Sequence, residues 1–183
     1  MNKIVWTYGL IAGVIFGLEF TVVMSLTGIE GGAGGLLLGY TTMVAVGVLT
    51  YFGVRRYRDT VLDGRIRFGQ AAKVAALISL ISSVCYVASW EVVLRTSAQD
   101  FGEKYAAAAI ARAKADPKLT PQQVEAQTRS MQEFAQNYKN PMYRFAMTFV
   151  EPLPIAILTV LVSAYAVSRR RRDATGQLVG TVT

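Results

Sequence analysis

Residues 74–94 read VAALISLISSVCYVASWEVVL, and Glu91 is the only charged residue among them. A helix needs about 20 apolar residues to cross a hydrocarbon core of about 30 Å. Three more stretches have this character: 4–26, charged only at Glu19; 35–54, which carries no charge; and 145–167, charged only at Glu151. They show no alternation of period two, which argues against strands. We therefore predict an all-α fold, an integral membrane four-helix bundle.

The composition of the 183-residue chain supports this prediction and excludes several classes of function. Its residues are 52% hydrophobic and 17% charged, which argues against a disordered chain and against a soluble globular fold. The single cysteine, Cys85, cannot form an internal disulfide, and the lack of histidine removes the commonest metal ligand and general base. We expect no catalytic residue, no metal site and no cofactor, and predict that the protein is not an enzyme.

Positive charges gather at one side of the predicted bundle. They are Arg55, Arg56, Arg58, Arg65 and Arg67 after the second span, and Arg169, Arg170, Arg171 and Arg172 in the tail 168–183. Short cytoplasmic loops are enriched in Lys and Arg, so both termini and the tail are predicted to be cytoplasmic. We expect these arginines to contact anionic lipid headgroups. The net charge of +7 then reflects topology rather than nucleic acid binding.

The connection between the third and fourth spans is too long for a structureless loop. It predicts a helical hairpin outside the membrane over about 98–140. Thr120, Pro121 and Gln123 form a capping-box pattern at the start of its second helix. The apolar residues of that helix share one face: Val124, Met131, Phe134, Ala135 and Tyr138. This face must rest on the first hairpin helix, the membrane surface or another subunit, and packing within the chain is the favoured interpretation.

Glycines recur at intervals of four in the first two spans. They are Gly9, Gly13 and Gly17, followed by Gly35 and Gly39. Such spacing leaves a groove without Cβ atoms, along which another membrane helix can approach closely. The groove could serve as a homodimer face or as a packing face within one bundle, and the pattern itself does not choose between them.

The three acids inside the predicted spans fall in one layer. At 1.5 Å per residue, Glu19, Glu91 and Glu151 all lie within about 10 Å of the outer boundary of the core. A charged side chain facing lipid is costly, so we predict that all three turn inward. Arg95 shares a helix face with Glu91, Arg144 lies two turns before Glu151, and Tyr86, Trp90 and Tyr143 are possible hydrogen-bond donors.

The fourth span should be kinked or begin at Pro152. This residue lacks an N–H group and frees a carbonyl beside Glu151, and Pro154 frees another. Broken helices of this kind occur at ion sites in transporters. The six candidate site residues are therefore Glu19, Glu91, Glu151, Arg95, Arg144 and Pro152. They form either a structural polar cluster or a site that binds ions or protons.

Scattered motifs along the chain suggest a known family. They are Gly9-x-x-x-Gly13, Tyr57-Arg58-Asp59, Gly64, Phe68-Gly69-Gln70, Tyr86, Trp90, Asp100-Phe101, Tyr105, Asn140-Pro141 and Phe149-x-Glu151-Pro152. With them the chain resembles the domain-of-unknown-function family forty-one ninety-nine (DUF4199), small four-span membrane proteins of Gram-negative bacteria. The resemblance covers about residues 4 to 172 and implies a bacterial inner-membrane location. It implies no activity and no catalytic residues.

From these observations we expect a non-enzymatic inner-membrane protein whose partners are lipids and other membrane proteins. It would act as an accessory or scaffolding subunit that forms a homo-oligomer or docks to a larger membrane complex. The alternative is a small oligomeric transporter or channel for protons, cations or a small solute, with the carboxylates as its site. A lipid-handling role, with Arg95 and Arg144 at headgroups, is a third possibility.

Overall fold

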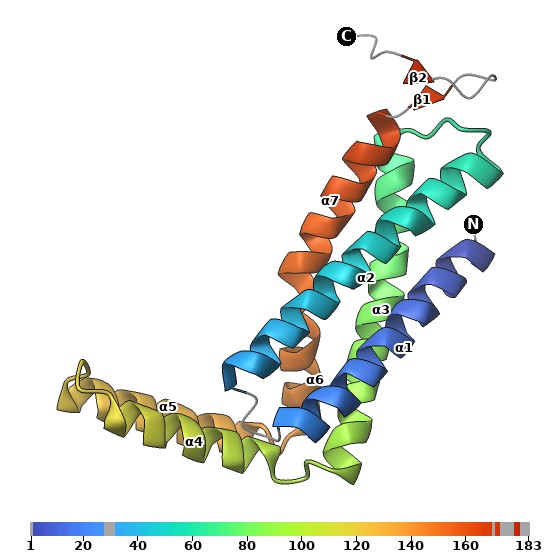
Figure 1. Cartoon of the computed structure of the whole chain (residues 1–183). Coiled ribbons are helices and arrows are strands. Elements are labelled where there is room, and N and C mark those ends of the chain that lie inside the picture. The colour runs from blue at the N-terminus through green and yellow to red at the C-terminus, as the bar shows by residue number, and fades with distance from the viewer. Residues whose placement is uncertain (1, 28–31, 170, 173–177, 180–183) are drawn as a thin grey trace.

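The computed structural model describes residues 2–27, 32–169, 171–172 and 178–179. The elements are α1 (Asn2–Thr27), α2 (Gly32–Val61), α3 (Phe68–Thr96), α4 (Phe101–Ala115), α5 (Pro121–Asn137), α6 (Pro141–Val150), α7 (Leu153–Arg169), β1 (Arg171–Arg172) and β2 (Leu178–Val179). The predicted all-α fold is confirmed, because β1 and β2 are only a two-residue antiparallel pair. Figure 1 shows α1, α2, α3 and the continuous pair α6–α7 side by side, with α4 and α5 projecting from one end.

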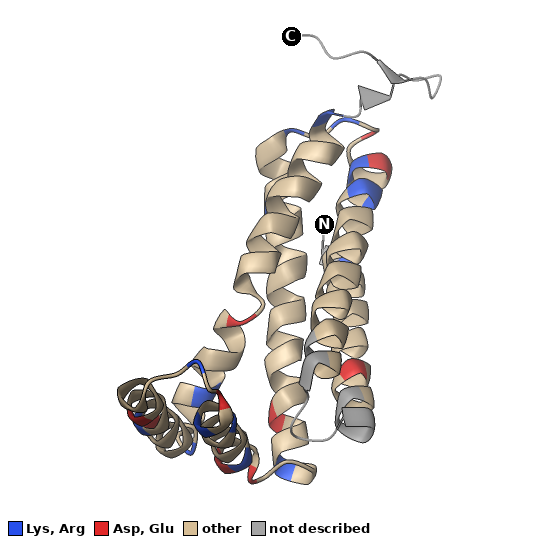
Figure 2. Ribbon diagram, turned by 60° about the vertical axis from the view of Figure 1, so that its left-hand side comes forward, with Lys and Arg blue, Asp and Glu red and all other residues tan. Residues whose placement is uncertain are grey.

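Four helical segments are long and apolar enough to cross a membrane. They are Lys3–Val22, Leu37–Val61, Phe68–Thr96 and Pro141–Arg169. Charged residues gather mostly at the two ends of the bundle and on the projecting helices (Figure 2). Large side chains such as Leu18, Val44 and Leu158 are exposed on the sides of the bundle, as contact with lipid requires. We call the end that carries α4 and α5 the hairpin end and the opposite end the tail end.

The helices are longer than the predicted spans. In particular α2 continues to Val61, so the expected connection 55–67 is helical over its first half. The fourth span is divided into α6 and α7 at the predicted proline site. Of the turn between the first two spans, residues 28–31 lie outside the described residues, as do Arg170 and most of the tail.

The glycine stripe of α1 packs against α3 of the same chain. A Cβ on Gly9 would lie 2.6 Å from Ile81 Cγ2, and one on Gly13 would lie 2.5 Å from Cys85 Cβ. One on Gly17 would lie 3.3 Å from Ser89 Oγ. The same four-residue step on both helices shows that α1 and α3 run parallel. Of the two interpretations of this stripe, the structure therefore favours packing within one bundle.

The glycines of α2 also approach other helices. A Cβ on Gly39 would lie 3.5 Å from Glu19 Oε1 on α1, and one on Gly47 would lie 2.8 Å from Thr159 Oγ1 on α7. Gly35 is partly buried in the first turn of α2. The small residues of α2 thus make room for polar side chains of its neighbours.

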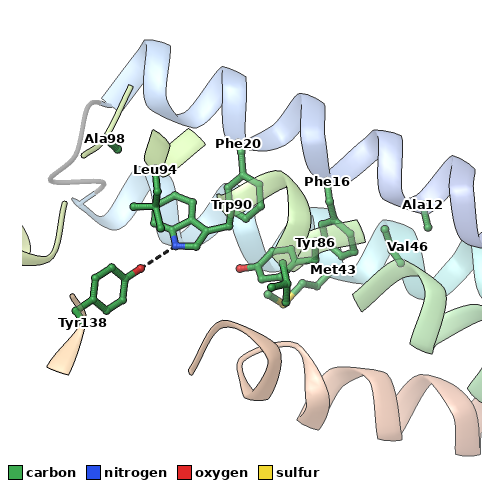
Figure 3. Close-up of a cluster of buried hydrophobic side chains, with 11 residues drawn as sticks. Ala12, Phe16, Phe20, Met43, Val46, Tyr86, Trp90, Leu94, Ala98 and Tyr138 are labelled. Atoms are coloured by element: carbon green, nitrogen blue, oxygen red, sulfur yellow. Dashed lines mark hydrogen bonds between the residues drawn. The ribbon is translucent and has the colours of Figure 1, made fainter. Parts of the chain in front are cut away.

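The bundle core changes character along its length. At the tail end it is aliphatic, with Val54, Val74, Ile78 and Val167 almost fully buried. At the hairpin end it is aromatic, and Figure 3 shows rings from α1 and α3 against one another. The ring centroids of Phe16 and Phe20 lie 4.9 and 4.8 Å from that of Tyr86. Aromatic pairs at these separations stabilise packing beyond the area that they bury.

Arg58 does not contact headgroups as predicted, because it is buried at the tail end. Arg58 is only 3% exposed. Its Nε donates to Asp59 Oδ1 at 2.7 Å, and its Nη1 donates to the Val167 carbonyl at 3.2 Å. The last carbonyls of a helix lack partners within that helix, so Arg58 satisfies one at the end of α7. The other described side chains of this predicted group differ: Arg56, Arg65, Arg67 and Arg169 are exposed, and Arg55 is partly exposed.

We expect Arg58→Gln to lower the free energy of unfolding by about 2 kcal/mol, because a hydrogen bond from a charged donor joins α2 to α7. Thermal unfolding in mild detergent measures the loss. The matched control is Arg56→Gln, which removes the same charge from an exposed position nearby. Equal effects of the two variants would contradict a specific role for Arg58.

The α4–α5 hairpin has the caps and the apolar interface predicted from the sequence. The Thr120 hydroxyl accepts from the Gln123 N–H at 3.3 Å, and the Gln123 side chain accepts from the Thr120 N–H at 2.9 Å. The apolar face of α5 rests on α4: the Phe134 ring lies 5.7 Å from Tyr105, and a Cβ on Gly102 would lie 2.9 Å from the Tyr138 ring. No residue of α5 itself is buried.

Candidate functional site at the hairpin end

A bidentate ion pair at the hairpin end joins α3 to α6. Arg144 Nε lies 2.8 Å from Glu91 Oε1, and Arg144 Nη2 lies 2.9 Å from Glu91 Oε2. The side chains are 16% and 23% exposed. Glu91 lies near the end of α3 and Arg144 near the start of α6, so the two helices bring them to one level. A bidentate pair of this kind is both strong and geometrically specific.

The same arginine reaches the base of the hairpin. Arg144 Nη1 donates to the Tyr138 carbonyl at 3.2 Å, and its guanidinium lies 6.0 Å from the centroid of the Tyr138 ring. The Tyr138 hydroxyl accepts a hydrogen bond of 2.7 Å from Trp90 Nε1, which Figure 3 shows. Burial raises the pKa of Tyr138, so its hydroxyl stays neutral. We call Trp90, Glu91, Tyr138 and Arg144 the hairpin latch, because together they join α3, α6 and the end of α5.

Glu151 lies at the break between α6 and α7. Pro152 is buried there, and the helical hydrogen bonds resume where the Ala156 N–H donates to the Pro152 carbonyl at 2.9 Å. Tyr86, from α3, donates its hydroxyl to Glu151 Oε2 at 2.9 Å. The predicted donor is therefore present. The prediction that all three acids turn inward is wrong for Glu151, however, which is exposed because the break carries it to the edge of the bundle.

Glu19 is the third acid of the predicted layer. It is partly buried on α1 and lies beside Gly39 of α2. It is close enough to Glu151 and to Tyr86 for electrostatic interaction with both. No ion pair of Glu19 occurs among the residues that the structure describes. Glu19, Tyr86 and Glu151 thus form a second polar group, which we call the acid pair with its tyrosine.

The structure divides the six predicted site residues into two sets. Arg144 pairs with Glu91 rather than with Glu151, while Arg95 is exposed and reaches Glu91 only at longer range. The sequence-based prediction missed the contact between Trp90 and Tyr138. The available signals were that Trp90 is a hydrogen-bond donor near the end of the third predicted span, and that Tyr138 lies near the end of the hairpin on the same side of the membrane.

A small cavity with a mixed apolar and hydroxyl lining lies between the helices farther from the hairpin. Its volume is about 20 Å³, which is the size of one water molecule. Hydroxyl groups from three helices contribute to its lining: Thr50, Ser79, Ser82, Ser83 and Thr159. Two of these hydroxyls bond within their own helices, Thr50 to the Val46 carbonyl and Ser82 to the Ser79 carbonyl. Beyond it toward the tail end lies the aliphatic core, beside which Arg58 is the one buried charged residue among those that the structure describes.

No group of three His, Cys, Asp or Glu side chains that could hold a metal ion occurs among residues 2–27, 32–169, 171–172 and 178–179. Cys85 is partly buried against Gly13 and fills space between α1 and α3.

Comparison with known proteins gives a family but no activity. Residues 7–169 match a family model described as "Protein of unknown function (DUF4199)", which confirms the resemblance predicted from the sequence. No curated protein and no solved structure matches the chain.

Proposed function

We propose that this chain, which belongs to the DUF4199 family, is a non-enzymatic subunit that docks to a larger membrane complex through its α4–α5 hairpin. The observation that carries the proposal is the hairpin itself. It projects from the bundle (Figure 1), and no residue of α5 is fully buried, although its apolar face packs on α4. Only the base of the hairpin, with Phe101, Phe134 and Tyr138, packs against the aromatic core, so the rest of this long element is available to a partner.

The hairpin latch fixes the orientation of the hairpin relative to the bundle, so that the hairpin acts as a rigid arm. It combines a bidentate ion pair, a hydrogen bond to the Tyr138 carbonyl and a buried bond between Trp90 and Tyr138. Residues locked by packing and by such bonds hold a binding surface in a fixed orientation. A rigid arm loses little conformational freedom when it binds, which favours affinity.

The exposed surface of the arm is polar and of mixed charge. Arg129 and Glu125 form an exposed pair at 3.4 Å, and Glu133 and Gln132 lie beside them on α5. Such a surface suits a hydrophilic partner surface outside the hydrocarbon layer. The glycine stripe of α1 supports no dimer contact, because α3 already occupies it.

We further propose that the protein lies in the bacterial inner membrane with both termini in the cytoplasm. The support is the set of exposed arginines at the tail end, including Arg56, Arg65 and Arg67. The hairpin would then dock on the periplasmic side.

Site-specific crosslinking in native membranes tests the docking function. We expect a photo-crosslinking amino acid at Gln132, exposed on α5, to give a discrete protein adduct that mass spectrometry identifies. The control is the same group at Leu158, on the side of α7, which should react mainly with lipid. An adduct with a second copy of the chain would identify the partner as the chain itself. Absence of any protein adduct from Gln122, Gln132 and Gln136 would contradict docking through α5.

A second candidate function is supported by the acid pair with its tyrosine. Glu151 accepts from the Tyr86 hydroxyl beside a broken helix, and Glu19 lies within electrostatic range. Intramembrane carboxylates that share a site are typical of proton and cation binding. The hydroxyl-lined cavity lies farther along the same helices.

For this second candidate, we expect purified protein in liposomes to conduct protons or monovalent cations, and Glu151→Gln to abolish the flux. Tyr86→Phe should lower it by removing the hydrogen bond to Glu151. Glu125→Gln, on the exposed hairpin, is the control for loss of one acid. Flux that is absent from the unmodified protein, or unchanged in Glu151→Gln, would eliminate this candidate.

A further inference from the structure

A cavity of about 750 Å³ lies where the end of α3, the start of α4 and the end of α5 meet. Its volume is within the range of small-molecule sites. Five charged residues line it: Arg95, Asp100, Glu103, Lys139 and Arg144. The candidate span of α3 ends at Thr96, which also lines the cavity. The cavity therefore lies at the end of a candidate membrane span, which is where lipid headgroups meet a membrane-crossing helix.

Most of the lining charges are already compensated. Lys104 Nζ lies 2.8 Å from Asp100, and its hydrogen bond lowers the pKa of that carboxyl, which is therefore ionised and paired. Lys139 Nζ lies 2.8 Å from Glu103, and Arg144 is held by Glu91. These pairs leave no unpaired acid in the lining.

Arg95 is the exception among the lining charges. Its side chain is exposed, and it makes no ion pair within the part of the chain that the structure describes. It interacts with Glu91 only at longer range, and both oxygens of that carboxylate are taken by Arg144. The cavity thus has one uncompensated positive charge, carried by a planar group with five N–H donors.

We propose that this cavity binds a phosphate group through Arg95, with the phosphodiester of an anionic phospholipid headgroup as the source that its position favours. A guanidinium matches phosphate oxygens with two parallel hydrogen bonds. Inorganic phosphate offers the same chemistry from solution. The inference is independent of the docking function, because it concerns the base of the hairpin and not the exposed surface of α5.

Thermal unfolding of the purified full-length chain in detergent tests the proposal with three additions. These are phosphatidylglycerol, diacylglycerol with the same acyl chains but no phosphate, and inorganic phosphate. We expect phosphatidylglycerol to stabilise the protein more than diacylglycerol does, and Arg95→Gln to weaken this phosphate-dependent binding about tenfold. Stabilisation by inorganic phosphate as well would identify free phosphate as a ligand. Stabilisation by the lipid alone would identify the headgroup.

The matched control is Arg112→Gln, which removes the same charge from an exposed position on α4. This control should bind phosphatidylglycerol as tightly as the unmodified chain does. The affinity of Arg95→Lys should lie between those of the unmodified chain and Arg95→Gln, because lysine keeps the charge but not the paired N–H donors. Equal stabilisation by the two lipids would overturn the proposal. So would a phosphate-dependent effect that Arg95→Gln and Arg112→Gln retain equally.

Discussion

Replacing Arg144 with glutamine should lower the free energy of unfolding by about 3 kcal/mol, the lower part of the range for removing one partner of a buried ion pair. The variant leaves the carboxylate of Glu91 partly buried without its bidentate partner. It also removes the bond to the Tyr138 carbonyl at the base of the hairpin. Chemical unfolding in mixed micelles gives the free energy. Limited proteolysis should in addition cut residues 98–140 faster, because the hairpin has lost its attachment.

Two controls separate the latch from a general effect of charge. Glu91→Gln combined with Arg144→Gln should be less destabilising than Arg144→Gln alone, since it leaves no uncompensated carboxylate. Arg129→Gln removes one partner of an exposed pair whose side chains are 72% and 75% exposed, and should change stability by less than about 1 kcal/mol. An Arg144→Gln effect as small as that of Arg129→Gln would contradict the latch.

Gly13→Leu should destabilise the bundle by about 3 kcal/mol, the upper part of the range for overpacking. A Cβ alone would lie 2.5 Å from Cys85 Cβ and 2.7 Å from Cys85 Sγ, so α1 must move away from α3. The Cβ of Cys85 is fixed to its backbone and cannot rotate aside, unlike the end of a longer side chain. The same micellar unfolding experiment measures the loss.

The matched control is Gly69→Leu in the first turn of α3, where a Cβ would meet nothing within 4 Å. It should be close to neutral. A compensating change offers a second check: Gly13→Ala should be tolerated better with Cys85→Gly than alone, because the added methyl then occupies the space that the cysteine leaves. If Gly13→Leu were as mild as Gly69→Leu, close packing of α1 on α3 would be refuted.

The spans and the caps of this fold follow from local features of the sequence. Uninterrupted apolar runs determine where helices can cross a membrane. The start of α5 is set by the capping box of Thr120 and Gln123, two residues that are only three positions apart. The break in the fourth span follows equally from Pro152, which cannot donate a hydrogen bond wherever it lies.

The contacts between elements could not be predicted in the same way. Glu91 pairs with Arg144 across 53 positions of sequence, and their register depends on how α6 packs on α3. Arg95, one turn from Glu91, is the partner that helical spacing suggests, yet Arg144 is the residue that forms the bidentate pair. Similarly, the glycine spacing on α1 defines a groove but not its occupant, which only the parallel alignment with Ile81 and Cys85 of α3 identifies.

Arg58 shows how a topology signal can conceal a structural role. A cluster of arginines after an apolar run predicts a cytoplasmic surface, and the rule treats each member alike. Here α2 continues as a helix through the cluster, so successive arginines point in different directions. One of them, Arg58, turns toward the Val167 carbonyl, while Arg56 is exposed.

The distance between hairpin and bundle tests the central claim, that the latch holds the hairpin as a rigid arm. Spin labels are attached at Lys118→Cys, in the hairpin turn, and at Arg65→Cys, at the tail end, in a Cys85→Ala background. Pulsed electron paramagnetic resonance then measures the distance between the two labels. We predict one narrow distribution with the latch intact and a broad one in Arg144→Gln. A broad distribution with the latch intact, or an equally narrow one without Arg144, would contradict the account.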